Sequence, residues 1–238
     1  MKTVTQNALK LSLMLSLGMI TSTQAQAQTA EDFQTWGNIT ATGNLGIIQP
    51  ELKNFNYWLE GQGRFGLNTS DLSQAMLRAG LGYQLNKQTS IWLGYAWVPT
   101  DAPFTKTAFD EHRIWQQLLW SDKFSFGALT SRSRMEQRFI PTGSQVGWRF
   151  RQMLKLSVPW SFAPAFSFVA SDEYFVNLNK TNYGADDGFD QNRVFAGIGY
   201  NFNQPIKTEI GYMNQYIRRA NNPDRMDHIL SVNLYLNY

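Results

Sequence analysis

HILSVNLYLNY, residues His228–Tyr238, is the stretch of the chain that decides the fold. Successive side chains of a β-strand point to opposite faces, so every second residue shares a face. One face then carries His, Leu, Val, Leu, Leu and Tyr, and the other carries Ile, Ser, Asn, Tyr and Asn. Such alternation is typical of a strand with one face against lipid and the other against a polar interior.

Strand-like runs recur along the whole chain, and no window of comparable length has a clean helical period. We see no linker and no second domain. The runs expected to form strands are Trp36–Leu45, Phe55–Phe65, Ala75–Leu85, Ser90–Val98, Glu111–Trp120, Phe124–Phe139, Val146–Val158, Phe166–Asn179, Asn192–Phe202, Ile206–Arg218 and Asp227–Tyr238.

The connections between these runs alternate between short and long. The short ones are 86–88, 121–123, 159–164 and 203–205, and the long ones are 99–110, 140–145, 180–191 and 219–226. Outer-membrane barrels have short periplasmic turns and longer outer loops, so we expect the carboxyl terminus in the periplasm. The sequence predicts an all-β, antiparallel transmembrane β-barrel of about 10–12 strands.

The number of runs conflicts with this fold, because single-chain bacterial barrels have an even number of strands. Eleven runs leave two possibilities open. Either Trp36–Leu45 is not an ordinary crossing strand, or one strand has not been recognised in the sequence.

The amino terminus indicates export. Lys2 and Lys10 precede an apolar run, residues 11–20. After this run, Ala25-Gln26-Ala27 has the small-residue pattern of a cleavage site. This is the pattern of a secretory signal peptide, and the apolar run is too short to span a bilayer as a helix. We expect a cleaved signal over residues 1–27 and a barrel over residues 28–238.

Composition favours the outer membrane of a Gram-negative cell as the location. The chain has 8 Trp, 10 Tyr and 16 Phe, which barrels use as girdles at both membrane interfaces, and no Cys. Two lysines of the expected signal contribute to the net charge of only +3, which argues against nucleic acid as a partner. The expected partners are outer-membrane lipid and lipopolysaccharide, periplasmic chaperones and the barrel-assembly machinery, with Tyr238 as part of the assembly signal.

Charged residues occupy alternate positions on the face opposite the apolar one. They predict a charge-lined, polar lumen, which has two interpretations. In one, Arg–Glu pairs fill a narrow interior and hold the strands in register. In the other, the excess of cations makes an anion-attracting pore or cavity. The residues of this ladder are Glu60, Arg64, Arg78, Glu111, Arg113, Arg132, Arg134, Glu136, Arg138, Arg149, Arg151, Lys155, Glu173, Arg193 and Glu209.

Residues that carry chemistry are scarce. The two histidines, His112 and His228, fall on the expected outward face near strand ends, and Ser231 falls on the opposite face from His228. We expect no enzyme, no cofactor and no metal, although 110–112 and 186–187 contain groups able to bind a cation. The glycines of 80–82 and 197–199 precede no helix, so they indicate close strand packing rather than a phosphate loop.

Several phrases together resemble an uncharacterised family of bacterial outer-membrane barrels, numbered two-four-nine-zero among domains of unknown function. The resemblance covers essentially the whole chain after the signal. It implies a barrel and an outer-membrane address but no activity and no catalytic residues. The phrases are Leu93–Ala96, Glu111–Gln117, Arg132–Phe139, Trp148–Arg151, Asp172–Phe175, Phe189–Arg193 and Gly211–Tyr216.

The sequence therefore leads to a structural barrel or a narrow porin-like pore for small solutes, with anionic solutes as one option. The alternative is an enzyme that modifies lipids of the outer leaflet.

Overall fold

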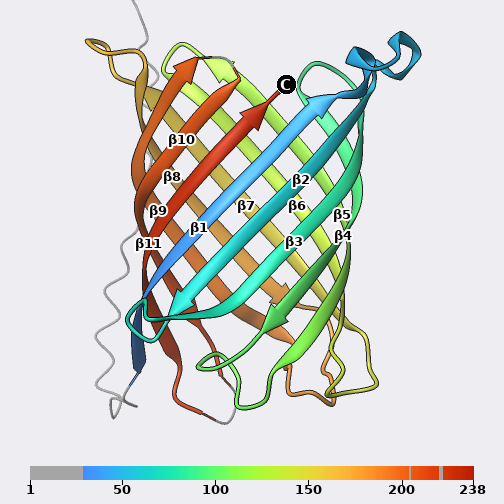
Figure 1. Ribbon diagram of the computed structural model, residues 1–238, viewed down its shortest axis with the longest axis vertical. Helices are drawn as coiled ribbons and strands as arrows, with labels where there is room; N and C mark the ends of the chain where they lie inside the picture. Colours follow the sequence, from blue (N-terminus) through green and yellow to red (C-terminus); the bar gives the residue numbers. More distant parts are fainter. Residues whose placement is uncertain (1–28, 204, 220–221) are drawn as a thin grey trace, which may run out of the picture.

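The protein is a closed barrel of eleven strands in the part of the chain that the computed structural model describes, residues 29–203, 205–219 and 222–238 (Figure 1). The expected signal peptide lies outside these residues. The strands are β1 (Ala30–Asn44), β2 (Phe55–Gly66), β3 (Asp71–Gln84), β4 (Thr89–Thr100), β5 (Phe109–Phe124), β6 (Gly127–Phe139), β7 (Gly147–Pro159), β8 (Phe166–Asn177), β9 (Gly188–Asn203), β10 (Ile206–Ile217) and β11 (Arg225–Asn237).

Each strand matches one of the eleven runs, so the all-β barrel is confirmed. None of the described helices is long and apolar enough to cross a membrane. Two short 3-10 helices, η1 (Leu45–Ile47) and η2 (Pro50–Leu52), lie between β1 and β2.

The expectation of an even strand number is wrong, because the barrel closes through a parallel pair. β1 and β11 run side by side in the same direction, with Ala30 opposite Arg225 and Thr42 opposite Asn237 (Figure 1). All other neighbouring strands are antiparallel. β1 is thus a full member of the barrel, and it begins six residues before the run expected at Trp36.

The two ends of the barrel differ in their connections. We call one the short-turn end, because it has the two-residue turn 125–126 and the four-residue turn 85–88; Tyr238 also lies there. The other is the long-loop end, with connections 101–108, 140–146, 178–187 and 218–224. The alternation expected from sequence holds with two exceptions. The ten-residue connection 45–54 lies at the short-turn end, and the four-residue turn 67–70 lies at the long-loop end.

Apolar side chains cover the outside of the barrel. Leu77, Leu93 and Leu154 are each more than half exposed, whereas Arg78 of β3 and Arg149 and Arg151 of β7 are buried on the other face. This is inverse to a water-soluble protein, in which large apolar side chains are buried.

Aromatic pairs on the outside gather near the two ends. Near the short-turn end, Phe166 packs on both Trp160 and Tyr200. Near the long-loop end, Phe189 packs on both Tyr174 and Tyr216. Two such belts with an aliphatic band between them have the arrangement of interfacial girdles.

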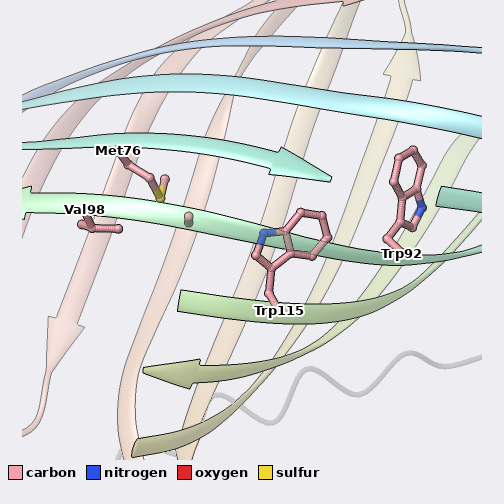
Figure 2. Packing of buried hydrophobic residues seen from close by; sticks show 5 residues of the cluster. Met76, Trp92, Val98 and Trp115 are labelled. Carbon is pink, nitrogen blue, oxygen red and sulfur yellow. The ribbon is translucent and has the colours of Figure 1, made fainter. Parts of the chain in front are cut away.

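Not all large apolar side chains face outward. Met76, Trp92, Val98 and Trp115 point into the barrel from β3, β4 and β5 and form a buried cluster (Figure 2). The strand glycines make room for these rings: a Cβ on Gly82 would lie 2.5 Å from the Trp92 ring. The expected role of the glycines of 80–82 in close packing fits this geometry.

Candidate functional site

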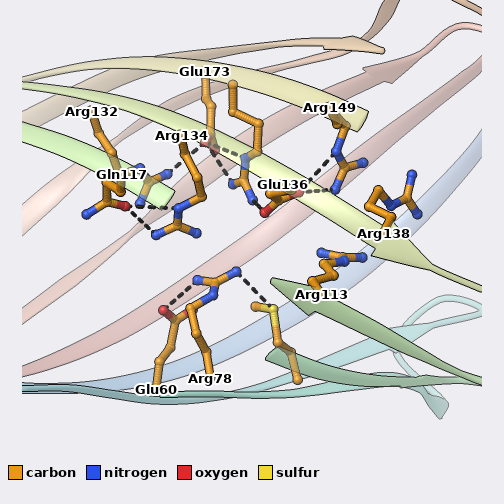
Figure 3. A network of polar contacts seen from close by, with 12 residues as sticks. Glu60, Arg78, Arg113, Gln117, Arg132, Arg134, Glu136, Arg138, Arg149 and Glu173 are labelled. Atoms are coloured by element: carbon orange, nitrogen blue, oxygen red, sulfur yellow. Dashed lines mark hydrogen bonds and ion pairs between the residues drawn. The ribbon is translucent and has the colours of Figure 1, made fainter. Parts of the chain in front are cut away.

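The interior of the barrel is the candidate functional site, because the structure places all fifteen residues of the charge ladder there. Twelve of them form ion pairs with one another. Figure 3 shows part of this network, around Glu60, Glu136 and Glu173. Arg64, Arg134 and Arg193 form no ion pair within the described residues. Their hydrogen bonds go to glutamine side chains instead.

Two carboxylates at the long-loop end, Glu111 and Glu136, each hold two guanidiniums. Glu111 accepts paired hydrogen bonds from Arg113, at 2.7 Å for both, and from Arg138. Glu136 accepts from Arg149 at 2.7 Å and from Arg151 at 2.6 Å. Such forked bonds satisfy both groups and restrict their orientation.

This network fills the long-loop end. Glu136 is 0% exposed and Glu111 is 1% exposed, so a water-filled path does not reach either carboxylate. We call the group that fills this end the sealing cluster. It comprises Glu111, Arg113, Glu136, Arg138, Arg149 and Asp190.

A second chain of ion pairs crosses the middle of the barrel. Arg151 donates to Glu136 and also to Glu173, which accepts from Arg132 at 2.7 Å. Arg151 therefore connects the sealing cluster to the middle of the interior.

Arg134 is a buried cation in the same layer with no carboxylate. It is 1% exposed and donates twice to Gln117 Oε1, at 2.9 and 2.6 Å. Its guanidinium carbon lies 4.7 Å from the centre of the Trp115 ring and 6.0 Å from that of Trp58. Its Nη1 has no acceptor in the described residues. Aromatic rings and one amide thus replace the anion that such a charge normally requires.

The short-turn end of the interior is hollow. A cavity of about 750 Å³ extends from the middle of the barrel to the level of Thr42 and Asn237, near the ends of β1 and β11. None of the sealing cluster lines it. Glu209 pairs with Lys155 at 2.6 Å and with Lys207 at 2.9 Å on its wall.

Sequence reasoning missed several interior residues. Asp32 and Asp227 both bind Arg225, across and along the β1–β11 seam, at 3.1 and 2.6 Å. Asp190 binds Arg149 at 3.2 Å. It lies at the β-bulge where the register between β8 and β9 shifts. Lys123 and Lys207 line the cavity. Lys207 is two positions before Glu209 on the same strand, so alternation could have placed it inside. Alternation could not place Asp190, because a bulge changes which residues face inward.

The histidines lie on the outward face, near the long-loop end. His112 Nδ1 is hydrogen-bonded to the Tyr95 hydroxyl, and His228 Nδ1 to the Tyr212 hydroxyl at 2.6 Å. Ser231 is buried on the other face. In the described residues no three metal-binding side chains gather at 110–112, at 186–187 or elsewhere.

Polar side chains also interrupt the outward apolar face on β5–β9. Gln116 and Gln137 exchange two hydrogen bonds of 3.0 and 2.9 Å. Gln152 bonds to two serines of β6, and Asn192 donates to Asp172. These side chains satisfy one another across neighbouring strands, which limits the cost of placing them on an apolar surface.

The fold and its interior define the class of this protein as a closed all-β barrel with buried ion pairs. A family model described as a protein of unknown function, DUF2490, matches residues 33–227. The chain belongs to this family, which confirms the resemblance found in its sequence.

One relative was found among curated proteins. A protein of Methylorubrum extorquens, described as uncharacterized, is 35% identical over 232 residues, covering 95% of this chain and 97% of its own. No solved structure matches the chain.

Proposed function

We propose that the protein is an outer-membrane β-barrel with a blind interior: the sealing cluster closes one end, and the cavity opens at the other. The observation that carries the proposal is the inverted distribution of side chains, apolar outside and ion-paired inside. Lipid covers the apolar outer surface and so stabilises that distribution. In water the same surface would stay exposed, at a free-energy cost of about 25 cal/mol per Å².

In this proposal residues 1–27 direct export, and the short-turn end faces the periplasm. Of the two roles that the sequence leaves open, the filled long-loop end favours a structural or solute-binding barrel over an open pore. A conducting state would need the sealing cluster to separate.

Cell fractionation tests the location. The full-length protein is expected in the outer membrane, with its amino terminus at Gln28 by mass spectrometry. It is expected to migrate differently on gels before and after boiling. Recovery in the soluble periplasm would contradict the proposal.

Tyr238 provides a second test, because its backbone joins the seam: its N–H donates to Thr42 O at 2.8 Å. Deleting Tyr238 is expected to lower the amount of folded protein in the membrane, whereas Tyr238→Phe is the matched control that keeps an aromatic end. Equal membrane levels for the deletion and the wild type would contradict its role as an assembly signal.

Planar-bilayer recordings test the blind interior. The wild type is expected to show no steady open current. The double variant Glu136→Ala, Arg149→Ala opens space within the sealing cluster, and it is expected to conduct. Arg151 keeps Glu173 as a partner in this variant, whereas Asp190 loses its cation. A steady wild-type current would show instead that the barrel is an open pore.

A further inference from the structure

We infer that the cavity at the short-turn end binds a small organic anion with an apolar, planar body. The inference deepens the proposed function, since the cavity is the blind interior of the same barrel. Three features of the cavity carry it: its charge, an apolar patch on its lining and two guanidiniums without carboxylates.

Cations predominate among the residues that line the cavity. Seven basic side chains face three carboxylates. The basic residues are Arg64, Lys123, Arg132, Arg151, Lys155, Arg193 and Lys207. Lys155 and Lys207 share a single carboxylate, Glu209. An enclosed space with excess positive charge attracts anions from solution.

Arg64 and Arg193 mark the inner part of the cavity. Their guanidinium carbons lie 4.0 and 4.9 Å from the centre of the same ring, that of Trp36. Arg64 donates to Gln62 and Gln74, and Arg193 to Gln191 at 3.2 Å. Two neighbouring cations held only by neutral partners have charge available for an added anion.

An apolar patch lies on the β2–β5 side of the cavity, where Glu60, Arg64 and Lys123 are the charged lining residues. Trp58, Met76, Trp92 and Leu119 line it there, as the inner surface of the buried apolar cluster. Trp58 and Trp92 meet edge to face, with ring centres 5.6 Å apart. Such a wall accommodates a flat apolar body. Together the cations and the apolar patch favour a ligand with a charged head and an apolar part. The cavity volume of about 750 Å³ is within the range of small-molecule sites.

The inference can be tested with 4-nitrobenzoate as the probe, because nitroaromatic rings quench tryptophan fluorescence and Trp36, Trp58 and Trp92 line the cavity. The full barrel in nanodiscs is titrated with 4-nitrobenzoate, with the neutral 4-nitrobenzyl alcohol and with inorganic phosphate as a competitor. Saturable quenching is expected for the anion. The alcohol is expected to bind about tenfold more weakly or worse, since a charge-assisted hydrogen bond contributes about 1.5–3 kcal/mol.

Two variants locate the site. Arg193→Gln is expected to weaken 4-nitrobenzoate binding about tenfold. Ala128→Trp, which fills space at the cavity wall, is expected to reduce binding without changing charge. Lys180→Gln, on an exposed loop pair, is the matched control and is expected to bind as the wild type does.

Three outcomes would overturn the inference: equal binding of anion and alcohol, phosphate binding as tight as that of nitrobenzoate, or unchanged binding by both Arg193→Gln and Ala128→Trp. If Arg193→Gln does not fold, the Ala128→Trp result and the comparison of probes still decide. A barrel that inserts into the outer membrane but ignores nitrobenzoate refutes this inference alone. A protein that binds the anion but is soluble in the periplasm refutes the proposed location alone.

Discussion

The two ends of the interior contain similar residues in unlike arrangements. At the long-loop end, Glu111 and Glu136 each hold two arginines, and the Arg149 side chain is 5% exposed. At the short-turn end, Lys155 and Lys207 share Glu209 and are 21% and 24% exposed. The same alternation of charges thus makes a filled, satisfied network at one end and an accessible basic surface at the other. The packing around the charges, rather than the number of charges, distinguishes the filled end from the hollow end.

The largest effect is expected when a carboxylate is neutralised within the sealing cluster. Glu136→Gln leaves Arg149 and Arg151 buried with a weaker partner, so the free energy of unfolding is expected to fall by about 3–5 kcal/mol. Glu209→Gln is the matched change at the hollow end. There the two lysines line the cavity and are partly exposed, so water is able to solvate them, and the expected loss is about 1 kcal/mol or less.

Urea unfolding in lipid vesicles measures both changes. Equal losses for Glu136→Gln and Glu209→Gln would erase the distinction between the two ends. A loss below about 0.5 kcal/mol for Glu136→Gln, as at exposed sites, would mean that water reaches the sealing cluster.

A second pair of variants compares paired and unpaired arginines. Arg151→Met removes a partner from both Glu136 and Glu173, and a loss of about 2–3 kcal/mol is expected. Arg134→Met removes a cation that has no carboxylate, so stability is expected to stay within about 1 kcal/mol of the wild type or to rise. The same urea series measures both, and a larger loss for Arg134→Met would mean that Trp115 and Gln117 stabilise the lone cation more than an ion pair does.

The smallest effect is expected outside the interior. The double change His112→Gln, His228→Gln replaces outward side chains that contact tyrosines, and a change within about 0.5 kcal/mol is expected. We expect no hydrolysis of phospholipid or lipopolysaccharide by the wild type. Hydrolysis by purified wild type that disappears in the double variant would support the enzyme alternative, since loss of a general base typically costs 10²–10⁴-fold.

Alternation predicted most of the fold and the inward positions, because a strand with two unlike faces repeats every second residue. It failed where both faces are polar, as at the start of β1, so Asp32 was missed. It failed again at Asp190, because the bulge there changes which residues face inward.

Contacts between distant strands leave no local signal. The parallel pairing of β1 with β11 follows from the register of the whole barrel rather than from either strand alone. Aromatic residues were expected as membrane girdles, yet Trp36 and Trp115 lie inside against arginines. A tryptophan that faces lipid and one that stacks on a guanidinium look alike in composition.

The parallel seam has a consequence for how this chain closes on itself. Arg225 and Asp32, which meet across it, are 193 positions apart, whereas every antiparallel pair joins strands that follow one another in the chain. Formation of the seam therefore has the largest entropic cost of loop closure among the strand pairs. Parallel pairing is also slightly less stable per residue than antiparallel pairing. Two unclosed chains, by contrast, are able to join their β1 edges antiparallel about a two-fold axis. The nearness of both edges within one chain favours closure into a monomer. Pairing between chains becomes more competitive as the protein concentration rises, so refolding at high concentration is expected to yield a larger share of dimers.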